Sequence, residues 1–227
     1  MPMHRELNQD FFKSWSPDMA YVLGYFAADG SMAQNTRGAH FMEFASTDSI
    51  LIRHVRKVTG SSHSVTIRDR GGTNWKTQYR LQIGSKEWFT DLSRLGFTQA
   101  KSNTLQFPII PKAYTGDFVR GYFDGDGCVY LGEHYSKWHK KRVWVFTTRF
   151  TSGSKQFLDD LQRELKAFGL VGGYVTHKNR GFELVFSRHD SVALYQLMYH
   201  TGLDSDLFLP RKRTKLERAI RVLRLRG

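Results

Sequence analysis

Two nine-residue stretches decide the fold of this chain: VLGYFAADG at residues 22–30 and VRGYFDGDG at residues 119–127. Both contain Gly-Tyr-Phe and end in Asp-Gly, and their last acidic residues are Asp29 and Asp126. The two copies lie about one small domain apart in the chain. A duplicated motif at this spacing predicts an internal structural repeat.

The segments that follow the two motifs also correspond. Each motif precedes a strand-like run, HFMEFAST or VWVFTTRFTS, and then a helix-like run, DSILIRHVRKVTG or GSKQFLDDLQRELKAFG. Two further strand-like runs and another helix complete each copy. We predict the order αββαββα for one repeat: a helix, two strands, a helix, two strands and a helix. The whole chain is predicted to be an α/β (α+β) protein of two pseudo-symmetric units.

Local patterns support this assignment. Residues 155–168 carry apolar side chains at three- and four-residue spacing, and Gly169 is placed to end that helix. Residues 79–83 instead alternate, with Tyr79, Leu81 and Ile83 on one side of a half-buried strand. The tail at 211–227 is predicted to be an amphipathic closing helix.

A break in the pattern predicts the domain boundary. The segment FPIIPKAYTG at 107–116 contains two prolines and a glycine and is interpreted as a linker. Residues 1–106 then form the N-terminal half, and residues 117–227 form the C-terminal half. Two related units in one chain can associate about a pseudo-twofold axis, as in a C2 dimer. The sequence thus predicts a monomer and implies no protein partner.

The composition favours an anionic partner. The 227 residues carry 34 Lys and Arg against 21 Asp and Glu, a formal net charge of +13. Residues 1–115 hold 14 basic and 9 acidic side chains, and residues 116–227 hold 20 and 12. Because each half has its own positive excess, both are expected to face the same nucleic acid.

The remaining composition excludes other classes of protein. Cys128 is the only cysteine, so the chain has neither an intrachain disulfide nor a Cys-rich zinc module. Its N-terminus is charged and polar, and no stretch approaches the roughly 20 apolar residues of a membrane helix. We expect an intracellular protein that is neither secreted nor inserted in a membrane.

Small residues in the two motifs predict a close helix pair. Such an approach, backbone to backbone, is allowed by the small residues Gly24, Ala27 and Ala28 in the first motif and Gly121 and Gly125 in the second. An Asp at the end of each helix would then lie near its symmetry mate. Two adjacent carboxylates repel each other unless a cation separates them, and hard oxygen ligands near a phosphate favour Mg²⁺. Metal-assisted hydrolysis of a phosphodiester is the chemistry that such a pair supports.

The two nonapeptides and the repeat order resemble the LAGLIDADG homing endonucleases of the single-chain, two-motif type. KSNTLQFPIIP at 101–111 also resembles the junction between the halves of such proteins. The resemblance implies a saddle of two antiparallel sheets over double-stranded DNA. It implies a site-specific endonuclease that hydrolyses both strands of a long asymmetric target and leaves short 3′ overhangs.

The resemblance also implies roles for individual residues. Asp29 and Asp126 match the essential acids, and the backbone carbonyls of Ala28 and Gly125 match further metal ligands. The implied cofactor is Mg²⁺, and Mn²⁺ or Ca²⁺ can occupy the same sites. Lys101 and Lys212 are the candidate catalytic lysines, because each follows the last helix of its repeat. Ala27 and Asp124 occupy the motif's sixth position, which is often acidic.

Strand positions that alternate along the sheets are the candidate DNA contacts. Arg and Gln are natural readers of guanine and adenine edges in the major groove. The predicted DNA-binding residues are Arg68, Arg70, Lys76, Gln78, Arg80 and Gln82 in the first half, and Thr147, Arg149, Thr176, Lys178 and Arg180 in the second. Because the halves differ at these positions, the target is expected to be asymmetric.

Two other functions fit the same features. An RNA splicing maturase, or another nucleic-acid-binding protein without cleavage, would use the same fold. Loss of a motif acid would favour that alternative, but both acids are present. At the level of single residues, the aspartates could simply be helix-end caps and the basic strands an ordinary solvated face. Residues 134–144 could form a DNA-contacting hairpin or a basic loop.

Overall fold

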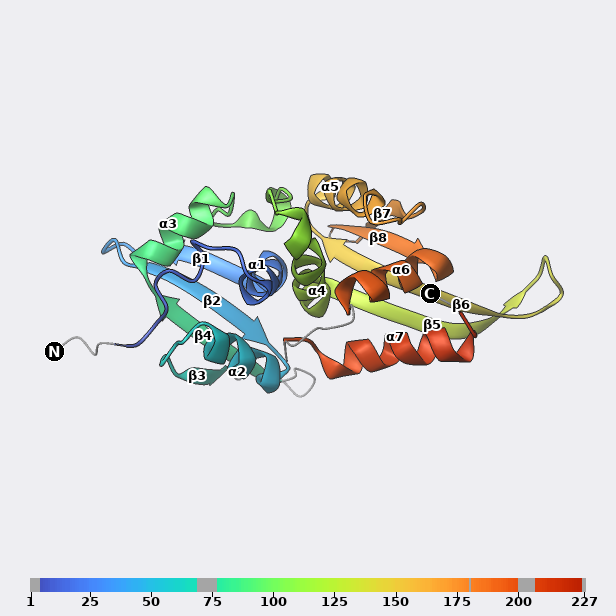
Figure 1. Cartoon of the computed structure of the whole chain (residues 1–227), viewed down its shortest axis with the longest axis horizontal. Helices are drawn as coiled ribbons and strands as arrows, with labels where there is room; N and C mark the ends of the chain where they lie inside the picture. The colour runs from blue at the N-terminus through green and yellow to red at the C-terminus, as the bar shows by residue number, and fades with distance from the viewer. Residues whose placement is uncertain (1–4, 69–76, 180, 200–206, 226–227) are drawn as a thin grey trace. The chain divides into compact units, whose positions relative to one another are not determined.

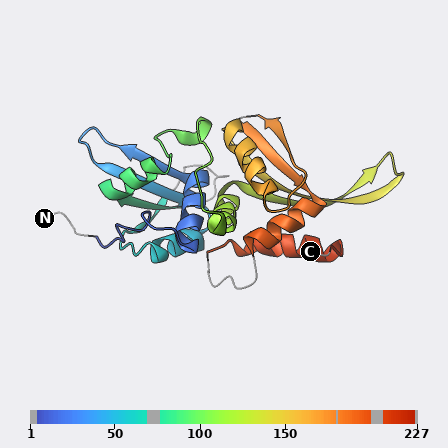
Figure 2. The same cartoon turned by 45° about the horizontal axis from the view of Figure 1, so that its top comes forward.

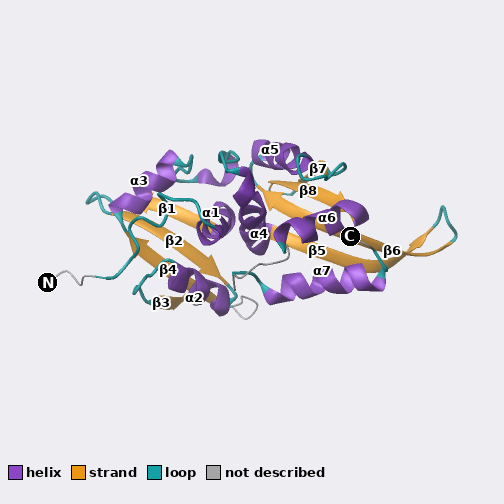
Figure 3. Cartoon of the chain, viewed as in Figure 1, coloured by secondary structure: helices purple, strands orange, loops and turns teal. Residues whose placement is uncertain are grey.

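Two four-stranded antiparallel sheets with helices packed against them make up this α+β protein, as Figure 1 shows. The computed structural model describes residues 5–68, 77–179, 181–199 and 207–225. Figure 3 distinguishes the strands from the helices that accompany them. The predicted fold class is confirmed.

The first repeat has the predicted order of elements. It consists of α1 (Pro17–Asp29), β1 (Gly30–Gln34), β2 (His40–Ser46), α2 (Ser49–Val58), β3 (Val65–Arg68), β4 (Gln78–Gly84) and α3 (Lys86–Arg94). Helix α1 begins where it does because Ser16 accepts a hydrogen bond from the Met19 N–H and a proline fills the first helical position. The strands lie in the order β1-β2-β4-β3.

The second repeat has the same order and one additional helix. It consists of α4 (Thr115–Asp126), β5 (Gly127–Ser136), β6 (Lys141–Ser152), α5 (Lys155–Lys166), β7 (Tyr174–Lys178), β8 (Gly181–Ser187) and α6 (Arg188–Met198), followed by α7 (Pro210–Val222). Its strands lie in the order β5-β6-β8-β7. Two short 3-10 helices, η1 (Lys101–Asn103) and η2 (Lys112–Tyr114), lie between the repeats. The αββαββα order is thus confirmed twice.

Each sheet buries one face against helices. In the first sheet, Phe44 and Leu81 are fully buried, and α2 packs against β2 and β4. In the second, Phe150 and Phe186 are fully buried beneath the apolar stripe of α5, which has the predicted spacing. Burial of one such side chain stabilises a fold by about 1.5–3 kcal/mol. Gly169 follows α5 with a φ of 84°, the left-handed conformation expected of a residue that ends a helix.

The chain forms two compact units whose limits differ from those of the repeats. Helix α4 belongs to the first unit as far as Gly125, and residues 102–107 belong to the second. The predicted linker at 107–116 follows the boundary between the two repeats, and this division of the chain stays a prediction. Helix α4 begins inside that segment, at Thr115. Within the described ranges, no helix has both the length and the apolar character needed to cross a membrane.

Candidate active site

The two motif helices, α1 and α4, touch backbone to backbone within the first unit. A Cβ placed on Gly24 would lie 2.0 Å from the carbonyl oxygen of Phe118, and one placed on Gly121 would lie 2.0 Å from that of Tyr21. Only residues without a side chain permit this reciprocal approach. The close helix pair predicted from the small motif residues is confirmed.

The C-terminal ends of these helices also meet. A Cβ on Gly125 would lie 2.4 Å from the Cβ of Ala28 and 3.2 Å from Oδ2 of Asp29. The carboxylate of Asp29, exposed at the end of α1, therefore lies beside the last turn of α4. Asp126, which is half-buried, is the next residue after Gly125 in the chain.

Lys101 lies at the same helix end, although it is far from Asp29 in sequence. Its Nζ donates a hydrogen bond to the carbonyl oxygen of Ala27 at 2.8 Å and lies 5.7 Å from the ring centroid of Phe26. The side chain is buried, so its ammonium is held against the last turn of α1. Lys212, the other predicted lysine, is buried in the first turn of α7.

The donor groups at this helix end suit a hard cation. Asp29 supplies carboxylate oxygens, and the last carbonyls of a helix have no partner within it. The carbonyl of Ala28 belongs to that set because α1 ends at Asp29. Among the residues that the structure describes, no cluster of three or more His, Cys, Asp or Glu side chains could hold a metal. A Mg²⁺ ion would therefore need carbonyl, water or phosphate oxygens to complete its shell.

A buried polar network between α1 and α4 was not predicted from the sequence. The hydroxyl of Tyr21 donates to Oδ2 of Asp124 at 2.7 Å, and Asp124 is almost fully buried. Burial, together with the charge of Asp124, raises the pKa of Tyr21 well above its usual value. Asp124 thus joins the two helices. The only signal in the sequence was an acid in one motif copy where the other has Ala27.

Arg120 forms a second part of this network. It is fully buried, forms an ion pair with Asp117 at 2.8 Å, and donates from Nε to the carbonyl of Leu207 at 3.0 Å. Its guanidinium also lies 5.3 Å from the ring centroid of Tyr21. Arg120 therefore holds α4 to α1 and to the segment that precedes α7.

In the first sheet, the face opposite the helices carries the predicted readers. Gln78, Arg80 and Gln82 alternate with the buried Leu81 and Ile83. Arg68 lies opposite Gln78 across the β3–β4 pair and so shares its face. Arg80 is held by Glu43, with 2.5 Å between Nη2 and Oε2. Two more predicted residues, Arg70 and Lys76, lie outside the described residues.

The second sheet presents a matching face. Thr147 and Arg149 alternate with buried residues of β6, while Thr176 and Lys178 share their face through the β7–β8 and β6–β8 pairs. Predicted residue Arg180 lies outside the described residues. Glu183 was not predicted from the sequence, and its buried carboxylate accepts from Lys178 Nζ at 2.9 Å and from Arg149 Nη1 at 3.4 Å.

Arg149 is held by three neighbours on this face. Besides the ion pair with Glu183, its Nε donates to Thr147 Oγ1 at 3.2 Å. Its guanidinium lies 5.5 Å from the ring centroid of Tyr130. A guanidinium whose orientation is fixed before binding loses less entropy when it meets a base edge. The arrangement suits Arg149 for bidentate recognition of guanine.

Two αββαββα repeats, each opened by a motif helix that ends at an acidic residue, define a two-motif α+β protein. The family model described as the LAGLIDADG-like domain matches residues 16–94 and 114–199, which correspond to the two repeats. These ranges make up most of the chain. The chain therefore belongs to the LAGLIDADG-like domain family.

Similar proteins were found among curated sequences and solved structures. The DNA-directed RNA polymerase subunit Rpo1C of Methanocaldococcus jannaschii is 22% identical over 210 residues, which cover 91% of this chain and 21% of that protein. The chain thus spans about a fifth of this relative's length.

Two solved structures share the fold along most of the chain. The homing endonuclease I-WcaI bound to its DNA recognition sequence has a TM-score of 0.62 and 16% identity, covering 92% of this chain and 91% of that chain. I-SmaMI bound to uncleaved DNA in the presence of calcium ions has a TM-score of 0.51 and 11% identity, covering 82% and 81%. At these identities, the likeness shows the fold.

Proposed function

We propose that this chain is a site-specific endonuclease that hydrolyses both strands of a long, asymmetric DNA duplex with the help of a divalent metal ion. The observation that carries the proposal is the reciprocal glycine contact between α1 and α4. It brings the exposed carboxylate of Asp29 beside Gly125, the residue before Asp126. Membership of the LAGLIDADG-like family and the basic charge of both halves support it.

In this proposal, Asp29 and Asp126 hold Mg²⁺ together with the backbone carbonyls of Ala28 and Gly125. When bound, the ion supplies Lewis acidity that activates water and stabilises the leaving oxygen. The protein orients the carboxylates through the glycine contacts of the helix pair. Short 3′ overhangs and the use of Mn²⁺ or Ca²⁺ at the same site belong to the proposal as well.

Lys101 is proposed to act on the scissile phosphate. Its ammonium donates a hydrogen bond to the carbonyl oxygen of Ala27, which lies less than one helical turn from Asp29. The ammonium has little freedom to move because the side chain is buried. A fixed positive charge stabilises the negative charge that develops during hydrolysis. Lys212 is the corresponding candidate in the second half and stays a prediction.

We expect Lys101→Met to slow DNA cleavage by about 10²–10³-fold, the usual effect of removing one preorganised electrostatic group. Target affinity should change little, because the buried ammonium faces the helix end and not the readers on the sheet. Single-turnover cleavage at saturating protein measures the rate. Lys112→Met, at an exposed lysine of η2 in the same unit, is the matched control. Wild-type cleavage by Lys101→Met would remove Lys101 from the mechanism.

We expect Arg149→Ala to weaken binding to the target by about 1–3 kcal/mol and to relax the preference for one base pair. The reason is that the truncation removes a guanidinium held in place by Glu183 and Thr147. Lys155→Ala removes an exposed cation from α5, in the helix layer, and is the control. Binding to a set of targets with single-base changes measures the effect. A uniform loss across all of them would make Arg149 a phosphate contact instead.

A library of random duplexes tests the proposal as a whole. The purified chain is incubated with the library and Mg²⁺, and the broken ends are sequenced. Ends that cluster in one long asymmetric sequence, and only with metal present, are the expected result. If the chain bound duplexes without breaking them in either Mg²⁺ or Mn²⁺, the result would favour the non-cleaving alternative, such as a splicing maturase.

A further inference from the structure

The strand register assigns equivalent positions in the two sheets. The first strand after each motif helix begins with a glycine, which pairs with Phe44 of β2 in one repeat and with Phe150 of β6 in the other. These phenylalanines also pair with a leucine on their other side, Leu81 of β4 or Leu184 of β8. Phe44 therefore corresponds to Phe150, and Leu81 corresponds to Leu184. Figure 2 shows both sheets, the first in blue to green and the second in yellow-green to orange.

The residue before each of these four positions is charged, and the charges are reversed between the repeats. In the first repeat the two residues are Glu43 on β2 and Arg80 on β4, and in the second they are Arg149 on β6 and Glu183 on β8. Both repeats join the two side chains in an ion pair, with 2.5 Å between Arg80 Nη2 and Glu43 Oε2 and 3.4 Å between Arg149 Nη1 and Glu183 Oε2. The same ion pair thus occurs twice with its acid and its base exchanged.

The surroundings of the ion pair are alike in the two repeats. Strands β3 and β7 each place a threonine opposite the β4 or β8 member of the pair, Thr66 in the first repeat and Thr176 in the second. A cation follows two residues later on each strand, Arg68 or Lys178. Each repeat therefore gathers two cations and one acid on the face opposite its helices. Between the repeats, the acid and the arginine of the pair change places while these neighbours keep their character.

The ion pairs remain accessible to a ligand. The side chains of Arg80 and Arg149 are 31% and 33% exposed, and those of Glu43 and Glu183 are 24% and 9% exposed. Partly exposed ion pairs stabilise a fold only weakly, so stability gives little reason for the same pair at the same place in both repeats. A ligand that met this face would find hydrogen-bond donors and an acceptor side by side.

Such a combination matches the edge of one kind of base pair. In the major groove, guanine presents two adjacent acceptors, which suit the fork of an arginine, and cytosine presents a donor, which suits a glutamate. In an A·T pair, the adenine donor separates the two acceptors, so an arginine fork finds no adjacent acceptors there. A phosphate has only acceptors and is repelled by the carboxylate. The arginine–glutamate pair therefore fits a G·C base pair in one orientation.

We propose that Glu43 and Glu183 determine specificity: together with Arg80 and Arg149, they select one G·C base pair in each half of the target. The two base pairs have opposite orientations, each in the frame of its own repeat, because the acid and the arginine have exchanged strands. A palindromic pair of half-sites would match one repeat and not the other. The inference rests on the proposed DNA-binding function.

Exchanging the charges within one repeat tests the inference. The double variant Glu43→Arg with Arg80→Glu gives the first repeat the arrangement of the second and keeps both the ion pair and the net charge. Targets are selected from random duplexes without Mg²⁺, and binding to single-base-pair variants of each target is then measured. We expect the preference at one position to change from G·C to C·G, with discrimination of about tenfold or more between the two. The variant Arg149→Glu with Glu183→Arg should do the same on the opposite side of the cleavage site.

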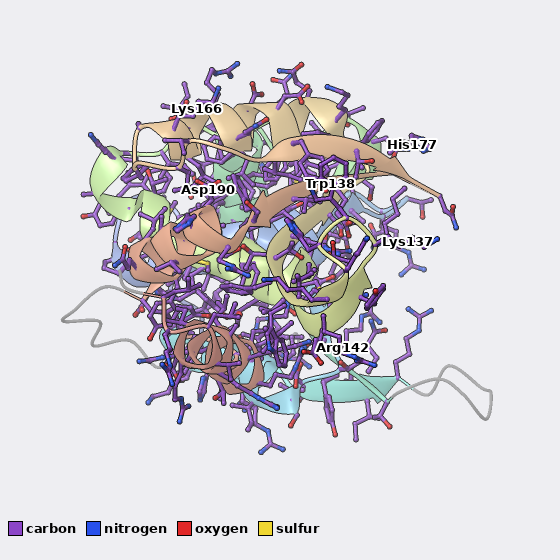
Figure 4. All side chains as sticks on the ribbon, turned by 90° about the vertical axis from the view of Figure 1, so that its right-hand side faces the viewer. Lys137, Trp138, Arg142, Lys166, His177 and Asp190 are labelled. Atoms are coloured by element: carbon purple, nitrogen blue, oxygen red, sulfur yellow. The ribbon has the colours of Figure 1, made fainter. Side chains whose placement is uncertain are left out.

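A single substitution provides a second test that does not require a new ion pair. Glu183→Gln should lower the ratio of target affinity to random-duplex affinity by about tenfold, because the amide no longer repels phosphates or requires cytosine. Glu164→Gln causes the same change of charge at an exposed position of α5, two residues before the Lys166 that Figure 4 labels, and should leave the ratio unchanged. Circular dichroism should give both variants the melting temperature of the wild type.

The outcomes separate the two proposals. Specific binding with the same base preferences in the wild type and both exchange variants would overturn the inference and leave the proposed function standing. Absence of specific binding by the wild type to any duplex would overturn both. If Glu183→Gln lowered the melting temperature and kept the affinity ratio, the ion pair would serve the fold alone and the inference would be wrong.

Discussion

Asp29→Asn and Asp126→Asn are each expected to abolish double-strand cleavage while leaving target binding nearly intact. Replacing a carboxylate by an amide removes the negative charge that would hold the metal ion in the proposed mechanism but keeps the size of the side chain. A bound metal contributes several kcal/mol of transition-state stabilisation. At 1.36 kcal/mol for each factor of ten, the rate should fall by about 10³-fold or more. Single-turnover cleavage with Mg²⁺ measures the rate, and gel retardation measures the binding.

Asp18→Asn is the matched control for these two variants. Asp18 lies in the first turn of α1, at the opposite end of the helix from Asp29. Its substitution should cost only the small helix-dipole contribution of about 0.3–1 kcal/mol in stability. Cleavage of both strands by the Asp29 and Asp126 variants at the rate of the Asp18 variant would rule out the proposed mechanism.

The second large effect is expected on folding. Gly121→Ala would place a methyl group 2.0 Å from the Tyr21 carbonyl oxygen and 2.9 Å from the Tyr25 nitrogen. Both atoms belong to backbone, so the helices must separate. Ala has a better helix propensity than Gly by about 1 kcal/mol, but overpacking of this kind costs about 3 kcal/mol or more. The net cost is then about 2 kcal/mol or more, so for a chain of this size we expect the melting temperature to fall by roughly 4–8 °C or more.

Gly24→Ala should have a similar effect, because its Cβ would lie 2.0 Å from the Phe118 carbonyl oxygen. Gly84→Ala provides the comparison: a Cβ there would lie 3.7 Å from the Phe41 ring, an ordinary contact. Thermal unfolding followed by circular dichroism measures all three. If the Gly24 and Gly121 variants had the same melting temperature as the Gly84 variant, α1 and α4 would not be packed backbone to backbone in solution.

Much of the fold could be predicted because the deciding information is local and duplicated. The small residues of the two motifs predicted the helix contact, and the alternation in 79–83 predicted which side chains of β4 are buried. The duplication predicted the order of the remaining elements, because a motif that begins one αββαββα unit indicates that its second copy begins another. The alternation also placed Arg149 and Lys178 on a common face, as the strand pairing shows.

Other features depend on tertiary contacts that sequence spacing does not reveal. The bond between Tyr21 and Asp124 joins residues that only the helix crossing brings together. Nothing in the sequence distinguishes Arg120 from an exposed basic residue, but in the structure it is fully buried beside Asp117. Glu183 was not predicted because the role of an acid on a sheet face expected to bind DNA becomes evident only beside the cations that it holds.

The most direct test of the central claim is to map the breaks in both strands of the selected target in EDTA, Ca²⁺ and Mg²⁺. If the two motif acids act on the same duplex, both strands should be cut in Mg²⁺, a few nucleotides apart, and leave 3′ overhangs. No cut is expected in EDTA. Breaks confined to one strand, or breaks that persist in EDTA, would contradict a paired, metal-dependent site at Asp29 and Asp126.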